Sequence, residues 1–145
     1  MLQKKQGVPP RAVIIDYGMA TSYLDSNDEH LAKEKMSEFR GNLFFTSISK
    51  LEFNRPCRKD DFVSLCYFMI FLINGCELPL FKEYFSDKSD SEVEQIDLIR
   101  KFKKENSLLD MLDEIQIVSR KEKQQLEKLI KLILSLKFKS KPDYD

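Results

Sequence analysis

Apolar residues divide the chain into a short run near the N-terminus, a long polar stretch and a helical remainder. Ala12 to Ile15 is a continuous run rich in β-branched residues, which predicts a short buried strand. Residues 1–11 before it predict a loop, and the polar residues 21–42 predict a second, long loop of a kind that is usually functional. Because a lone strand cannot satisfy its own backbone groups, we expect its partner from residues 19–21 or from outside this chain.

The central apolar run predicts a helix over about residues 60–74. Its side chains are apolar nearly all round, so we expect this helix to be buried on every side. Either Asp60 or Asp61 can cap its start, and Asn74 with Gly75 can end it.

Amphipathic patterns predict three more helices, over residues 91–106, 108–112 and 119–138. Ser119 and Glu122 form a capping-box signature at the start of the last one. The core-facing stripes are Val93, Ile96, Ile99 and Phe102, and then Leu126, Leu129, Ile130, Ile133 and Leu136. The expected fold is therefore mainly α, one domain with a short β strand or hairpin at its N-terminus and a central buried helix.

Composition narrows the classes of function. The 145 residues hold 24 Lys+Arg and 24 Asp+Glu, which gives no global reason to expect nucleic acid or a membrane surface as partner. The apolar window Phe62–Ile73 is shorter than the roughly 20 residues that cross a bilayer, and the N-terminus has no apolar leader. Three cysteines without a close pair and one histidine support no zinc site. Reduced thiols, with Cys66 buried, predict an intracellular protein of the cytoplasm or nucleus.

The candidate chemistry begins at Asp16, Tyr17 and Gly18, directly after the predicted strand. Alone, aspartate and glycine here would be ordinary turn residues. Three later stretches change that interpretation. They are "RGNLFFTSI" at 40–48, "RKDDFVSLCYFMIFLINGCELPL" at 58–80 and "LKFKSKPDY" at 136–144.

In this order, and together with "IIDYGMA" at 14–20, the stretches resemble the C-terminal lobe of a protein kinase of the casein kinase 1 group. The Lys-Asp-Asp start of the central helix and the closing Lys-Pro-Asp-Tyr are the most specific pieces. The resemblance implies a partial kinase domain over 1–145, from the Asp-Tyr-Gly motif onward. Its activation segment would be 16–49, its central helix about 60–74 and its further helices 91–137.

The resemblance also assigns roles to residues near the strand. Asp16 matches the aspartate that chelates Mg²⁺ bridging the phosphates of ATP. Ile15 matches a residue lining the adenine pocket. Gly18 would let the backbone adopt the special conformation of the magnesium loop.

Further matches lie in the activation segment and the central helix. Gly41 and residues 45–48 match the end of the activation segment, where a peptide substrate is held. Asp61 matches a buried aspartate that bonds the catalytic-loop backbone, besides any capping role. Phe44 stands where the family has an arginine for phosphate or acidic groups, and phenylalanine cannot make that charge-assisted bond.

Phosphoryl transfer also needs a glycine-rich loop, a strand lysine and a catalytic loop. These 145 residues contain none of them, so no catalytic residue is assigned and we expect the chain alone to be inactive. The leading hypothesis is a fragment of a casein-kinase-1-like serine/threonine kinase acting on a protein substrate. The alternative is a pseudokinase-like remnant, a non-catalytic helical module that binds a partner protein.

Overall fold

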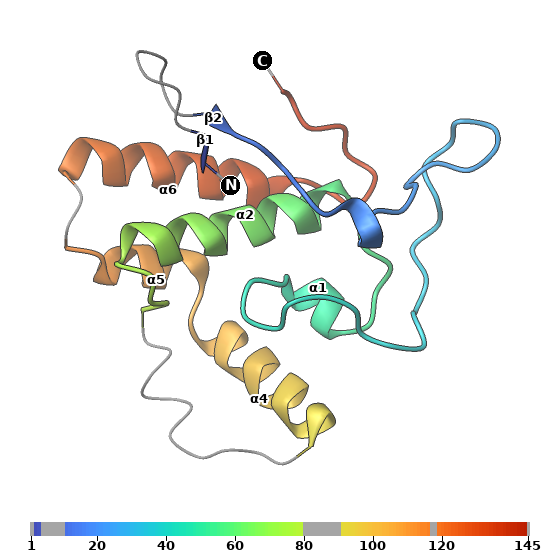
Figure 1. Cartoon of the computed structure of the whole chain (residues 1–145), viewed down its shortest axis with the longest axis horizontal. Coiled ribbons are helices and arrows are strands. Elements are labelled where there is room, and N and C mark those ends of the chain that lie inside the picture. The colour runs from blue at the N-terminus through green and yellow to red at the C-terminus, as the bar shows by residue number, and fades with distance from the viewer. Residues whose placement is uncertain (1, 4–10, 80–90, 117–118, 145) are drawn as a thin grey trace.

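The computed structural model describes residues 2–3, 11–79, 91–116 and 119–144. This part of the chain is mainly helical, as Figure 1 shows, and its few strand residues lie near the N-terminus. The elements are β1 (Leu2–Gln3), β2 (Arg11–Ala12), the 3-10 helix η1 (Tyr17–Met19), α1 (Ile48–Leu51), α2 (Arg58–Ile73), α4 (Glu92–Glu105), α5 (Leu108–Glu114) and α6 (Arg120–Ser135).

Side-chain caps fix where most of these helices begin. The hydroxyls of Ser47, Ser91, Ser107 and Ser119 each accept from the backbone N–H three residues on, at the starts of α1, α4, α5 and α6. Such caps satisfy N–H groups that have no partner within a helix. The predicted capping box of Ser119 and Glu122 is confirmed, and α4, α5 and α6 lie where the sequence pattern predicts them.

The core forms around α2, which packs against α5 and α6 (Figure 1). Cys66, Ile70, Phe102 and Met111 are almost wholly buried there, which confirms the prediction for Cys66. A smaller cluster holds α1 against α4 through Leu51, Ile96 and Ile99. The end of the long loop and the short helix α1 are thereby fixed to the helical body.

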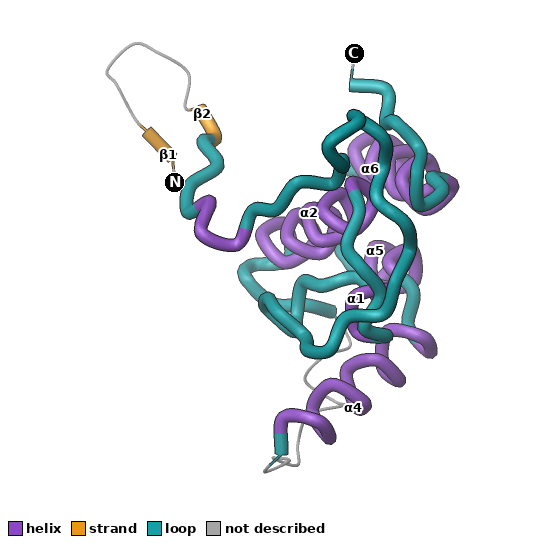
Figure 2. The backbone as a smooth tube through the Cα atoms, turned by 90° about the vertical axis from the view of Figure 1, so that its right-hand side faces the viewer, coloured by secondary structure: helices purple, strands orange, loops and turns teal. Residues whose placement is uncertain are grey.

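The predicted buried strand at Ala12–Ile15 is wrong. Of this run, only Ala12 is in a strand. That strand, β2 (Arg11–Ala12), pairs antiparallel with β1 (Leu2–Gln3), which lies within the residues predicted as a loop. Val13, Ile14 and Ile15 are 47%, 78% and 59% exposed, and Met19 lies in a 3-10 helix instead of supplying a partner strand. Figure 2 shows the β1–β2 pair standing apart from the helices, and the described residues leave this apolar run largely exposed.

The prediction that the central helix is buried on every side is also wrong. One face of α2 carries Leu65, Phe68 and Leu72, which are 46%, 42% and 51% exposed. Their spacing of three and four residues places them on a single face. Residues 21–42 contain no helix or regular strand, which confirms the predicted loop. No helix of the described residues is long and apolar enough to cross a membrane.

Candidate functional site

Asp16 is held in a left-handed backbone conformation, with φ 63° and ψ 75°. Its Oδ1 accepts a bond of 3.4 Å from the N–H of Gly18, and the 3-10 turn begins directly after it. A non-glycine residue in this conformation is uncommon and frequently marks a functional position. Gly18 itself has no positive φ, so the left-handed residue of this turn is Asp16, and the role of Gly18 in a magnesium loop stays a prediction.

The described residues do not form a complete metal site around Asp16. No group of three or more His, Cys, Asp or Glu side chains in this part of the chain could hold an ion. Mg²⁺ prefers six oxygen ligands in a strict octahedral arrangement, and one exposed carboxylate supplies one or two of them. Ile15 is 59% exposed, so no adenine pocket closes over it within the described chain. The described residues therefore do not fit Mg-ATP by themselves.

The predicted end of the activation segment is well ordered by local bonds. Gly41 adopts φ 133°, which favours glycine, and a Cβ there would lie 3.3 Å from Lys50 Nζ. The Asn42 Oδ1 accepts a 2.8 Å bond from the N–H of Phe44. Phe45 packs edge-on against Phe68 and Phe71 of α2, with ring centroids 5.7 and 5.3 Å apart. The segment is thus anchored to the central helix through one aromatic side chain.

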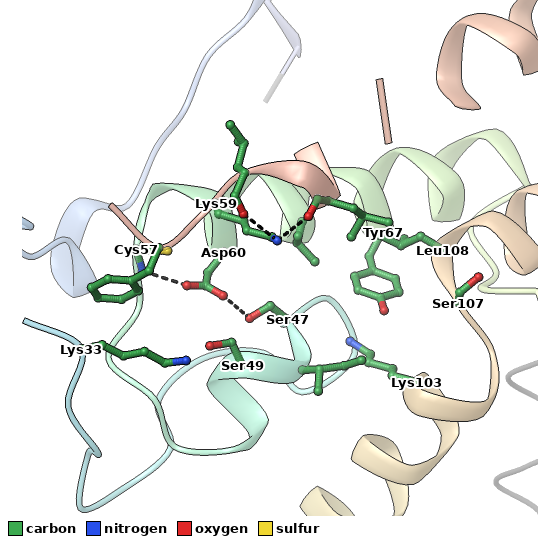
Figure 3. Close-up of a pocket in the computed structure, with 15 residues that line it drawn as sticks. Lys33, Ser47, Ser49, Cys57, Lys59, Asp60, Tyr67, Lys103, Ser107 and Leu108 are labelled. Atoms are coloured by element: carbon green, nitrogen blue, oxygen red, sulfur yellow. Dashed lines mark hydrogen bonds between the residues drawn. The ribbon is translucent and has the colours of Figure 1, made fainter. Parts of the chain in front are cut away.

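Asp60 joins this segment to the start of α2 (Figure 3). Its side chain is 3% exposed, and Oδ1 accepts a 2.5 Å bond from the hydroxyl of Ser47, which begins α1. Oδ2 accepts a 2.8 Å bond from the N–H of Cys57, the N-cap of α2. Asp60, and not the predicted Asp61, is the buried aspartate, since the side chain of Asp61 is exposed. Both carboxylate oxygens of Asp60 therefore serve the link between the segment and the helix.

Lys103 is a second buried charge at the same junction. It is 2% exposed and reaches from α4, where its Nζ donates to the carbonyls of Thr46 at 2.5 Å and Leu43 at 3.5 Å. The same nitrogen lies 3.9 Å from the centre of the Tyr67 ring on α2. Burial lowers the pKa of Lys103 to about 7. One amine thus connects Leu43 and Thr46 with the helices α4 and α2.

Sequence reasoning missed both buried charges, although each left a trace. Asp60 occupies the third helical position after Cys57, where a carboxylate reaches back to the N-cap. Lys103 follows Ile99 by four residues and therefore stands on the buried stripe of α4. A lysine at a core position indicates a specific partner, because a solvated lysine would face outward.

Comparisons with known proteins agree with the kinase-like pattern. The chain is 30% identical over 137 residues to a probable casein kinase I homolog of Encephalitozoon cuniculi (strain GB-M1). The match covers 92% of this chain and 39% of that protein. This similarity supports a kinase-like relationship. No protein-family profile matches the chain, which spans about two fifths of the relative's length.

Proposed function

We propose that the chain is the activation-segment and lower C-lobe part of a casein-kinase-1-like serine/threonine protein kinase. The observation that carries the proposal is the anchored segment 43–48. Buried bonds from Asp60 and Lys103 hold it against α2 and α4. In the family that the sequence resembles, Gly41 and residues 45–48 match the end of the activation segment, where a peptide substrate is held, and the similarity to a probable casein kinase I homolog covers 92% of the chain. A rigid platform of this kind suits positioning of a substrate, which is a large part of phosphoryl-transfer catalysis.

In this proposal, Asp16 is the residue that would hold Mg²⁺, and Ile15 would face the adenine of ATP. Within these 145 residues Asp16 lacks a phosphate cradle and a catalytic base, so the chain alone neither binds Mg-ATP appreciably nor transfers phosphate. Its partners are a protein substrate inside the cell, in the cytoplasm or nucleus, and neither nucleic acid nor a membrane.

A second candidate is a non-catalytic helical module derived from a kinase. The exposed apolar residues favour it, because such surface is costly in water and marks a binding site when it is continuous. Leu65, Phe68 and Leu72 form one exposed face of α2. Ile14 and Tyr17 on the N-terminal arm are 78% and 68% exposed.

Thermal denaturation in the presence of Mg-ATP tests the proposal for the chain alone. We expect 10 mM Mg-ATP to shift the melting temperature by less than about 1 °C, because ligand stabilisation grows as RT ln(1 + [L]/Kd) and Asp16 lacks its partners. The matched control is Asp16→Asn, which should melt like the parent. A rise of several degrees that disappears in Asp16→Asn would show a complete nucleotide site and overturn this part of the proposal.

A further inference from the structure

A cavity of about 390 Å³ lies behind the anchored segment, between α1, α2, the end of α4, the start of α5 and the end of α6. Figure 3 shows Lys103 and Tyr67 close together in it, with Ser107 on one side and Asp60 with Ser47 on the other. Its volume falls within the roughly 300–1,000 Å³ of small-molecule sites. The cavity is thus large enough for a compact ligand.

Much of the wall is apolar and comes from three parts of the fold. Val63 lies on α2, Leu108 on α5, and Leu134, Leu136 and Phe138 at the C-terminal end of α6 and just beyond. Such a surface favours an aliphatic or aromatic body over a small hydrated ion.

Two charged side chains of the wall already form hydrogen bonds within the chain. Both oxygens of Asp60 accept bonds from Ser47 and Cys57. The Lys59 Nζ donates to the carbonyls of Leu134 and Leu136, at 2.6 and 2.8 Å. These two charges are therefore engaged in holding the helices together.

Lys103 differs because its known partners are all neutral. They are two carbonyl oxygens and the Tyr67 ring, and no carboxylate pairs with this amine among the described residues. A buried ammonium without a counter-charge is unfavourable, and the low pKa of about 7 expresses that cost. An anion entering the cavity would supply the missing charge.

We propose that this cavity binds an aliphatic monocarboxylate, with its carboxylate at Lys103 and its hydrocarbon chain along Val63, Leu108 and Leu134. Lys33 also lines the cavity but is exposed to solvent, so Lys103 is the buried amine of the wall that lacks a counter-charge among the described residues, and it matches one negative charge. The apolar part of the wall does not solvate the second charge of a phosphate. A cationic amphiphile of the same length would bring a like charge to Lys103 and is excluded. The site is separate from Asp16 and does not depend on kinase activity.

Isothermal titration at pH 6.5 with three ligands of equal chain length tests this site on the unaltered chain. We expect octanoate to bind at least about tenfold more tightly than 1-octanol or octylamine, because only octanoate pairs with the Lys103 ammonium. The chain has no tryptophan, so Leu134→Trp adds a single fluorophore in the wall that should report octanoate entry.

Two lysine variants test whether Lys103 supplies the positive charge that binds octanoate. Lys103→Met should remove the preference for octanoate over octanol, whereas Lys104→Met should retain it, because Lys104 is half exposed and pairs with Glu52 outside the cavity. Equal binding of octanoate and octanol by the unaltered chain, or no octanoate binding at all, would overturn the proposal without any variant. Undiminished preference in a folded Lys103→Met would overturn it as well.

Discussion

Replacing Asp60 by alanine is expected to lower the free energy of unfolding by about 3 kcal/mol. The change removes a buried carboxylate that accepts from Ser47 and from the backbone of Cys57. Bonds to a charged acceptor contribute about 1.5–3 kcal/mol each, and both donors would be left buried without an acceptor. Urea denaturation followed by circular dichroism measures the difference.

Asp61→Ala is the matched control for this experiment. It removes the same side chain one residue along, at an exposed position, and should change stability by less than about 0.5 kcal/mol. In Asp60→Ala, the backbone amide of Lys50 should exchange its hydrogen faster, because this amide donates to the Ser47 hydroxyl that Asp60 holds in place. Equal losses in the two variants would contradict the assignment of Asp60 as the link between the segment around Ser47 and α2.

The stability of the chain is expected to rise by about 2 kcal/mol between pH 7 and pH 9 because of Lys103. Burial lowers the pKa of its amine from 10.5 to about 7 in the folded state. Below pH 7 both states carry the proton, and the folded state bears the full cost of the buried charge. Between pH 7 and 10.5 only the unfolded state keeps the proton, so raising the pH favours folding by up to about 1.4 kcal/mol per unit.

The Lys103→Met variant isolates this contribution. The free energy of unfolding of this variant should not show the rise between pH 7 and pH 9. Subtracting it from that of the parent removes the contributions of titratable groups that both proteins share. Burial raises the pKa of the Cys57 and Cys66 thiols from 9.0 to about 11, so from about pH 8 they ionise in the unfolded state first and partly offset the rise in both proteins alike. Lys104→Met should follow the parent curve. Parallel curves for the parent and Lys103→Met from pH 7 to 9 would contradict a strongly lowered pKa.

Local signals in the sequence predict the helices well. Serines stand at the starts of α4, α5 and α6, and apolar residues recur at helical spacing, so local capping and periodic burial point to the same elements. Val93 and Leu129, 69% and 39% exposed, are the exceptions on the predicted stripes. Helical spacing predicts which face of a helix is apolar. Whether a residue near the end of that face is buried depends on which element packs against it.

The strand and the central helix were harder to predict because their burial depends on contacts outside the segment itself. Val13 to Ile15 and the Leu65–Phe68–Leu72 face are apolar enough to be buried, yet the described chain leaves them about half exposed or more. The same dependence on distant contacts applies to the choice between the adjacent residues Asp60 and Asp61. Asp60 turns inward because its carboxylate accepts from the N–H of Cys57, which the local capping pattern indicates, and from Ser47, thirteen residues away, which it does not.

Two kinds of observation support a kinase-like role for the candidate site, sequence similarity and the backbone of Asp16. The resemblance to the casein kinase 1 group rests on four stretches of sequence, and the similarity to a kinase homolog agrees with it. The unusual backbone of Asp16 suits a functional residue. The metal and nucleotide roles of Asp16 and Ile15 remain predictions, because they require groups that these 145 residues do not supply.

Phosphate transfer by a fusion protein tests the central proposal most directly. The chain would be joined behind a segment carrying the glycine-rich loop, strand lysine and catalytic loop of a casein kinase I, and assayed with ATP, Mg²⁺ and casein. We predict that the fusion phosphorylates casein and that Asp16→Asn lowers the rate about 100-fold or more. A fusion that unfolds cooperatively, yet transfers no more phosphate than its Asp16→Asn variant, would contradict the kinase proposal and favour the binding module.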